Sequence, residues 1–180
     1  MGETGSKFNH SRWFSKNHRR VLCLGLKSSG KSAITASLTS NFPRAAKPLP
    51  EIGCYKFKVA KYTIAFYDLK GDEQSKFFWR HHFEGSQGVI FVIDLSDMDS
   101  FENAKQVLKE LMNDLLLKDL PFLVIGNKID LSQRFNKETV MGMLDIQREK
   151  EWELILTCAI SGEGVIDGMK WLLEKMNSVS

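Results

Sequence analysis

The glycine-rich run GLKSSGKS, from Gly25 to Ser32, has the residue types and spacing of a phosphate-binding loop. It matches G-x-x-x-x-G-K-S, with apolar residues before it and a helix-compatible segment after it, which is the context that this pattern needs. The glycines let successive backbone N–H groups face a polyphosphate, and the helix N-terminus adds its positive end. Lys31 is expected to reach the β- and γ-phosphates, and the Ser32 hydroxyl to bind Mg²⁺. The predicted phosphate-binding residues are Gly25, Lys27, Ser28, Ser29, Gly30, Lys31, Ser32 and Ala33.

A second motif, Asn127-Lys128-Ile129-Asp130, follows a short apolar run and reads N-K-x-D. The Asp130 carboxylate can accept hydrogen bonds from both the N1–H and the exocyclic amine of guanine. Adenine has no donor at N1 and would leave that carboxylate unpaired, which costs about 1–3 kcal/mol or more. Lys128 can lie along the base and the phosphate-binding loop, and Asn127 can tie the loops together. Together with the phosphate-binding loop, this motif predicts a site for GDP or GTP with Mg²⁺.

Short apolar runs alternate with amphipathic segments along the chain. Most of the runs are continuous, as in a parallel sheet that is covered on both faces. We expect strands at 20–26, 54–60, 63–69, 89–95, 122–127 and 153–158, and helices at 31–41, 101–118, 137–148 and 165–177. Asp99 can cap the second helix. Its apolar stripe consists of Phe101, Ala104, Leu108, Leu111 and Leu115. The pattern predicts an open α/β sheet with the nucleotide at the carboxyl ends of its strands.

Several further runs resemble the Arf/Arl family of Ras-like small GTPases, from about Arg20 to the C-terminus. They are residues 25–26, 49–53, 67–71, 79–83, 88–94 and 157–162. The resemblance implies the P-loop NTPase fold of a small GTPase, a mostly parallel six-stranded sheet with helices on both faces. It also implies a third base-contacting loop at Cys158, Ala159 and Ile160, where the Ala159 N–H would meet guanine O6. By the same resemblance, Asp68 would orient a Mg²⁺-bound water and the Gly71 N–H would bind the γ-phosphate.

Three positions depart from the family pattern and bear on hydrolysis. Glu51 stands where a threonine usually closes on Mg²⁺; its carboxylate can ligate the ion but brings negative charge beside a triphosphate. Asp72 replaces the glutamine that orients the attacking water, and it lacks the amide donor. Lys27 replaces an aspartate, and its ammonium either lies near the γ-phosphate or points into solvent. We therefore expect slow or impaired intrinsic GTP hydrolysis, with Lys31, Lys27 and the degenerate Asp72 as the candidate catalytic residues.

Length and charge indicate one domain that carries a basic arm. A chain of 180 residues suits a single domain, which we expect to span residues 20–180. Residues 1–19 contain four basic residues and one acid, Glu3, so the net charge of this arm equals the net charge of +3 of the whole chain. The arm matches M-G-x-x-x-S, which makes Gly2 a candidate myristoylation site. One myristoyl chain binds membranes weakly and needs a second signal, such as basic or aromatic side chains.

Composition is ordinary for a cytoplasmic protein. The three cysteines are widely spaced and odd in number, which favours reduced thiols. No apolar run approaches the roughly 20 residues of a membrane helix. We therefore expect a cytoplasmic protein that associates reversibly with membranes through its arm.

Three functions remain open on the sequence alone. The favoured one is a GTP/GDP switch in membrane, vesicle or ciliary trafficking, acting as a monomer with effector, exchange-factor and GAP proteins and no nucleic acid. The second is a pseudo-GTPase scaffold that binds GDP or no nucleotide. The third is a P-loop kinase or ATPase, which the N-K-x-D motif disfavours. Arf-like proteins often present three aromatic residues to effectors, and the matching Cys54, Tyr67 and His82 retain one large ring, so an altered partner surface is expected.

Overall fold

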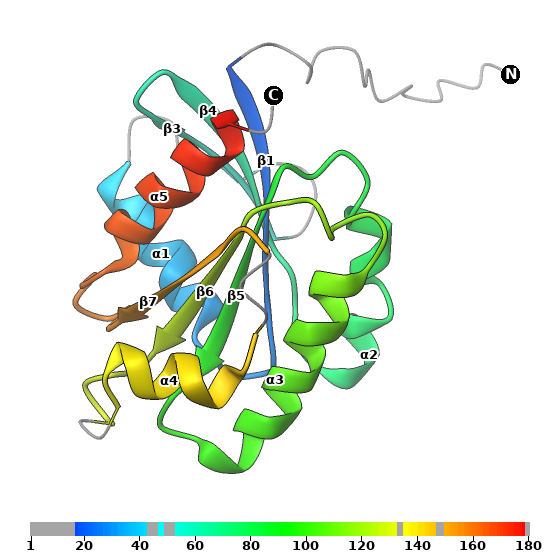
Figure 1. The fold of residues 1–180 in the computed structure, drawn as a ribbon. Helices are drawn as coiled ribbons and strands as arrows, with labels where there is room; N and C mark the ends of the chain where they lie inside the picture. Colours follow the sequence, from blue (N-terminus) through cyan, green and yellow to red (C-terminus); the bar gives the residue numbers. More distant parts are fainter. Residues whose placement is uncertain (1–16, 43–46, 49–52, 133–134, 147–149, 179–180) are drawn as a thin grey trace, which may run out of the picture.

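A seven-stranded sheet forms the centre of the fold (Figure 1). The computed structural model describes residues 17–42, 47–48, 53–132, 135–146 and 150–178. The strands are β1 (His18–Gly25), β2 (Lys47–Pro48), β3 (Cys54–Val59), β4 (Tyr62–Asp68), β5 (Gly88–Asp94), β6 (Phe122–Asn127) and β7 (Trp152–Thr157). They lie in the order β2-β3-β4-β1-β5-β6-β7. Strands β4, β1, β5, β6 and β7 are parallel, whereas the β2–β3 and β3–β4 pairs are antiparallel. The carboxyl ends of the five parallel strands therefore meet at one edge of the sheet.

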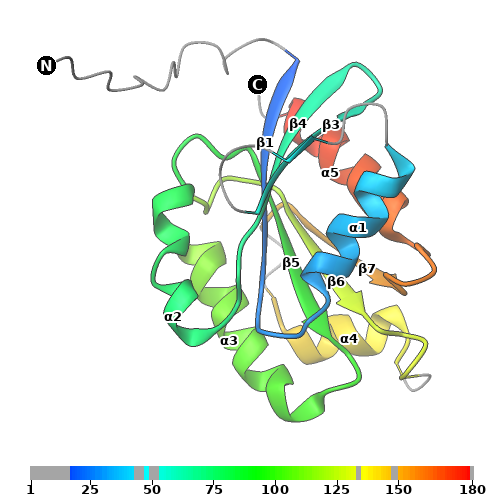
Figure 2. The same cartoon turned by 180° about the vertical axis from the view of Figure 1, so that it is seen from behind.

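Helices cover both faces of this sheet (Figures 1 and 2). They are α1 (Lys31–Asn41), α2 (Glu73–Lys76), α3 (Met98–Asn113), α4 (Lys137–Leu144) and α5 (Val165–Ser178), with a 3-10 turn at Trp79–His82. Helices α1 and α5 pack into one apolar cluster, and α3 and α4 pack into the other. In the described ranges, no helix combines the length and the apolar character needed to span a bilayer.

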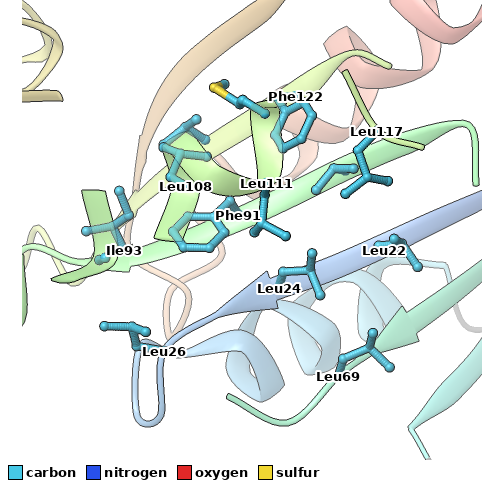
Figure 3. Close-up of a cluster of buried hydrophobic side chains, with 14 of the residues drawn as sticks. Leu22, Leu24, Leu26, Leu69, Phe91, Ile93, Leu108, Leu111, Leu117 and Phe122 are labelled. Atoms are coloured by element: carbon cyan, nitrogen blue, oxygen red, sulfur yellow. The ribbon is translucent and has the colours of Figure 1, made fainter. Parts of the chain in front are cut away.

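Strand β1 supplies side chains to both clusters, because successive residues of a strand point to opposite faces. Leu22 and Leu24 belong to the cluster with Leu108 of α3, and Figure 3 shows them beneath that helix. Val21 and Cys23 belong to the cluster with α1 and α5. All five side chains are fully buried. The loop that follows β1 therefore starts from a strand that is fixed on both faces.

The predicted α/β fold is confirmed, and each of the six predicted strands is present with bounds shifted by no more than two residues. Strand β2 adds a two-residue antiparallel edge that the sequence did not predict, because so short a segment carries no periodicity. The short helix α2 was also not predicted.

Two details of α3 differ from the prediction. The cap is Asp97, whose side chain accepts a hydrogen bond from the Ser100 N–H at 3.2 Å, so the choice of Asp99 was wrong. The helix ends at Asn113, which leaves Leu115 76% exposed instead of in the core stripe. Likewise α4 ends at Leu144, because Asp145 adopts a left-handed conformation with φ of 49°.

Candidate nucleotide-binding site

The phosphate-binding loop begins at Gly25, the last residue of β1, and its carbonyl groups enclose the Lys31 ammonium. Lys31 is buried, and its Nζ donates hydrogen bonds to the carbonyl oxygens of Gly25 at 3.0 Å and Leu26 at 2.7 Å. Burial lowers the pKa of Lys31, although acidic neighbours such as Asp68 oppose the shift. A buried ammonium that is bonded to carbonyl groups is stabilised by a nearby anion. The loop therefore suits a polyphosphate.

The Asn127 side chain ties this loop to the loop that follows β7. Its Nδ2 donates to the Ser29 carbonyl oxygen at 3.1 Å, and its Oδ1 accepts from Thr157 Oγ1 at 3.0 Å and from the Ala159 N–H at 3.1 Å. Gly30 makes this approach possible, because its φ is 101° and a Cβ there would lie 2.1 Å from Asn127 Nδ2. The tie expected from the sequence is thus present. The Ala159 N–H, predicted to meet guanine O6, is engaged by Asn127.

The other predicted base-contacting residues lie on the loops that follow β6 and β7. The Ile129 N–H donates to the Thr157 carbonyl oxygen at 3.3 Å, which holds the two loops side by side. Asp130 is exposed, Ile160 is 89% exposed, and Cys158 is buried. The Asp130 carboxylate is thereby open to an approaching base.

Lys128 makes an ion pair that the sequence did not predict. Its Nζ lies 2.5 Å from Asp94 Oδ2. Asp94 Oδ1 accepts from the Ser96 N–H at 2.9 Å and from Ser96 Oγ at 2.6 Å. Burial acts to raise the pKa of Asp94, but the contacts with Lys128 and Ser96 outweigh it and hold that pKa below its usual value. Asp94 could have been found from its place at the carboxyl end of a predicted strand, next to the strand that carries N-K-x-D.

The side chains of Asp68 and Thr35 are in contact where β4 ends beside α1. The Asp68 carboxylate accepts a hydrogen bond from Thr35 Oγ1 at 3.0 Å. Burial raises the pKa of Asp68, while the Thr35 and Ser32 side chains and the charge of Lys31 oppose the shift. Among the described residues, no group of three or more His, Cys, Asp and Glu side chains could hold a metal ion. Mg²⁺ in nucleotide sites uses one or two protein oxygens plus phosphates, so Ser32 and Asp68 fit that ion.

The segment after β4 touches the phosphate-binding loop and then turns into α2. A Cβ on Gly71 would lie 2.0 Å from the Gly25 carbonyl oxygen, so the two backbones are in contact. Asp72 caps α2: its carboxylate accepts from the Ser75 N–H at 2.9 Å and from Ser75 Oγ at 2.7 Å. These hydrogen bonds lower the pKa of Asp72. The carboxylate is directed to the helix.

Other predicted site residues stand apart from these contacts. The Lys27 side chain is exposed to solvent at the tip of the loop, as is Ser28 beside it, and Ala33 is partly exposed in the first turn of α1. Glu51 and Gly2 lie outside the described residues.

Of the three positions expected at the partner surface, two are covered and His82 is only partly buried. Cys54 and Tyr67 are both buried. The guanidinium carbon of Arg20 lies 4.1 Å from the centroid of the Tyr67 ring, and the same group donates to the His82 carbonyl oxygen at 3.3 Å. The arginine therefore stacks on the one large ring that these positions retain.

Two phenylalanines after α2 are exposed instead. Phe77 is 82% and Phe78 61% exposed. The next residue, Trp79, is buried, and its Nε1 donates to the Lys70 carbonyl oxygen at 2.7 Å. The tryptophan anchors the segment and leaves the two phenylalanine rings open to solvent.

A family model matches this sequence, and a solved structure shares its architecture. The model of the ADP-ribosylation factor family matches residues 6–176. The fold is similar to that of the Arl6 BBS3 small GTPase from Trypanosoma brucei, solved with the bound nucleotide analogue GppNp. That match has a TM-score of 0.77 and 22% sequence identity, and it covers 91% of this chain and 99% of the other. The chain therefore belongs to the ADP-ribosylation factor family of small GTP-binding proteins.

Proposed function

We propose that this chain binds GDP and GTP with Mg²⁺ in this site and acts as a molecular switch. The strongest support is the Asn127 side chain, which joins the phosphate-binding loop at Ser29 to the loop after β7 at Ala159. A nucleotide has to contact both loops at once. Because the protein already holds them together, less ordering is needed when the ligand binds.

On the phosphate side, the buried Lys31 and the N–H groups of the loop would bind the β- and γ-phosphates. The Ser32 hydroxyl would ligate Mg²⁺, and Asp68 would hold it through a water. Mg²⁺ held by these residues would supply positive charge that offsets the charge of the phosphates. The Gly71 N–H, whose backbone already touches the loop, would bind the γ-phosphate.

On the base side, the exposed Asp130 would accept the N1–H and the amine of guanine. The Ala159 N–H would be shared between Asn127 and guanine O6. The Lys128 stem would lie along the base. These donors and acceptors fit guanine and leave adenine unmatched, which argues against the kinase or ATPase alternative.

Titration calorimetry on nucleotide-stripped protein tests this proposal. With Mg²⁺ present, GDP and GTP should bind at least about a hundredfold more tightly than ADP, as expected for a site that hydrogen-bonds one base and not the other. The absence of heat with GDP and GTP, or equal affinity for ADP, would contradict it.

We also propose that hydrolysis is slow. Phosphoryl transfer depends on positioning and electrostatics, and the residue that should orient the water is an aspartate bonded to Ser75. The exposed ammonium of Lys27 can partly offset the charge of a triphosphate. The contact between Asp72 and Ser75 also favours a second candidate function, because an aspartate that is bonded to the helix is not free to assist hydrolysis. In that function, the protein is a scaffold that binds GDP or no nucleotide. Single-turnover hydrolysis of GTP separates the two, because a scaffold would not turn over the nucleotide.

Membrane trafficking is the setting that the sequence of the arm favours. Myristoylation of Gly2, together with the basic residues that follow it, would give reversible membrane association. The exposed Phe77 and Phe78 after α2 are then the surface to which effector, exchange-factor or GAP proteins would bind. Intact-mass measurement on protein from its native cell tests the acylation, because one myristoyl group adds a defined mass to the mature chain.

A further inference from the structure

The lysine of the N-K-x-D motif is held by a carboxylate from the neighbouring strand. The register of β5 and β6 pairs Asp94 with Asn127, so Lys128 leaves the sheet edge next to Asp94. Its Nζ lies 2.5 Å from Asp94 Oδ2. The β5 backbone continues the link, because the Leu95 N–H donates to the Asn127 carbonyl oxygen at 3.0 Å.

Asp94 is itself fixed, unlike a typical surface partner. Its side chain is 10% exposed. One oxygen takes the lysine, and the other takes two hydrogen bonds from Ser96. Exposed ion pairs contribute little because both side chains are free to move and water screens them, but this carboxylate is immobilised before it meets its cation.

The backbone of Lys128 adds an independent observation. Its φ is 65°, a left-handed conformation that a side-chain-bearing residue adopts only at a cost. The Leu131 N–H donates to the Lys128 carbonyl oxygen at 3.0 Å, which closes the turn around this strained residue. Such strain persists where surrounding contacts fix the residue, and the Asp94 pair is one of those contacts.

We propose that Asp94 is a positioning residue for base binding, an inference that rests on the proposed nucleotide function. By holding the ammonium at the end of β5, Asp94 keeps the lysine stem extended, so that its methylene groups form a fixed wall of the base site. It also keeps the cation away from Asp130, the carboxylate on the same loop that must stay available to guanine. Without Asp94, the freed ammonium would be attracted to Asp130.

Dissociation of a fluorescent GDP analogue measures this role. Asp94→Asn keeps the volume and the acceptor for Ser96 but removes the charge that holds Lys128. We expect the analogue to leave roughly tenfold faster than from the wild type, because a loosened wall of the base site weakens binding and affinity losses fall mostly on the dissociation rate. Glu153→Gln is the matched control: it removes an ion pair of 2.5 Å with Lys137, at the opposite end of β7, and should leave the rate unchanged.

A double-mutant cycle shows whether the effect passes through the lysine. Lys128→Met keeps most of the stem and removes the ammonium. In that background, Asp94→Asn should cause no further acceleration, whereas a general disturbance of the fold would accelerate dissociation in both backgrounds. Should Asp94→Asn fold poorly, Ser96→Ala provides the second variant: it keeps the charge, loosens the carboxylate, and should give a smaller acceleration.

The outcomes separate this inference from the function on which it rests. Wild-type protein that binds no GDP analogue would overturn both. Wild-type protein that binds, with Asp94→Asn releasing the analogue at the wild-type rate, would overturn the role of Asp94 alone. Equal acceleration in the wild-type and Lys128→Met backgrounds would also overturn it.

Discussion

The Asp72 carboxylate accepts hydrogen bonds from the Ser75 N–H at 2.9 Å and from the Ser75 hydroxyl at 2.7 Å. Both of its oxygens are thereby engaged by the first turn of α2. Aspartate is among the best N-cap residues, and glutamine is not. At the position proposed to orient the attacking water, this aspartate instead stabilises the helix that follows.

Replacing Asp72 with glutamine should speed single-turnover GTP hydrolysis by about tenfold or more, because the amide donor returns at the position where a water is oriented. Asp72→Ala is the matched control. Both variants lose the cap, which costs about 0.5–2 kcal/mol of helix stability, but alanine brings no donor. Hydrolysis by Asp72→Ala should therefore stay at or below the wild-type rate.

Equal rates for Asp72→Gln and the wild type, with GTP bound to both, would mean that Asp72 does not limit turnover. If neither variant nor wild type hydrolyses GTP, the scaffold function is favoured.

Removal of the Asn127 side chain should destabilise the protein even without nucleotide. Asn127→Ala leaves the Ser29 carbonyl, the Thr157 hydroxyl and the Ala159 N–H without their partner in a buried region. At about 1–3 kcal/mol for each unsatisfied buried group, the loss in unfolding free energy should be about 3 kcal/mol or more. Urea unfolding measures it.

The control for this prediction is Asn136→Ala. Asn136 caps α4 by accepting from the Thr139 N–H at 2.8 Å, and its removal should cost about 1 kcal/mol. Equal losses for the two asparagines would show that the link between the loops contributes no more than a surface cap.

Two aspartates at the site should affect acid stability in opposite directions. The pKa of Asp94 is lower in the folded protein than its ordinary value of 3.8, so the group stabilises the fold above that pH and the benefit is lost as the pH falls through the folded value. The pKa of Asp68 is raised by burial, so its ionised form destabilises the fold above the raised value and has no effect below 3.8.

Urea unfolding of nucleotide-free variants at pH 7 and at pH values near 3 checks the signs. Asp94→Asn should be less stable than wild type at pH 7, with the difference shrinking in acid. Asp68→Asn should be more stable than wild type at pH 7, and this gain should also shrink in acid. A loss of stability for Asp68→Asn at pH 7 would contradict the burial penalty.

In the segment after α2, a substitution at the exposed Phe78 should leave stability almost unchanged, whereas a substitution at the buried Trp79 should destabilise the protein. Phe78→Ser should alter the unfolding free energy by no more than about 0.5 kcal/mol, because the ring is 61% exposed. Trp79→Ala should cost about 3–5 kcal/mol, because the ring is buried and its Nε1 is bonded to the Lys70 carbonyl. Thermal unfolding compares the two neighbours directly, and similar losses would refute the division into an anchor and a free surface.

The sequence predicts the parts of this protein that depend on local pattern. The continuous apolar runs gave the parallel strands, and the spacing between Gly25 and Ser32 gave the loop. The predictions that were wrong concern features that depend on individual contacts. Asp97 and Asp99 are separated by less than one helical turn, so the sequence does not show which of them begins the helix. The backbone leaves the helical conformation at Asp97, and Asp97 is therefore the cap of α3. Leu115 continues the helical period, yet the helix had already ended.

Tertiary contacts within the site were least visible in the sequence. The position of Asp94 at the end of a predicted strand marks it as a candidate, but its pairing with Lys128 depends on the register of two strands, which the pattern of each strand does not contain. The stacking of Arg20 on Tyr67 likewise needs the packing of β1 against β4. By contrast, the tie from Asn127 to Ser29 could be expected, because both motifs follow strands that end at one edge.

The most direct test of the central claim, that Asp130 recognises a guanine base, is to change the base preference with Asp130→Asn. Xanthine carries a carbonyl where guanine carries the exocyclic amine, so Asp130→Asn can donate to that carbonyl while its own oxygen accepts the N1–H. Calorimetry with GDP and xanthosine diphosphate should show GDP affinity falling by about a hundredfold and xanthosine diphosphate becoming the tighter ligand. Unchanged GDP affinity in Asp130→Asn, or an equal loss for both nucleotides, would contradict the claim that this carboxylate reads a guanine base.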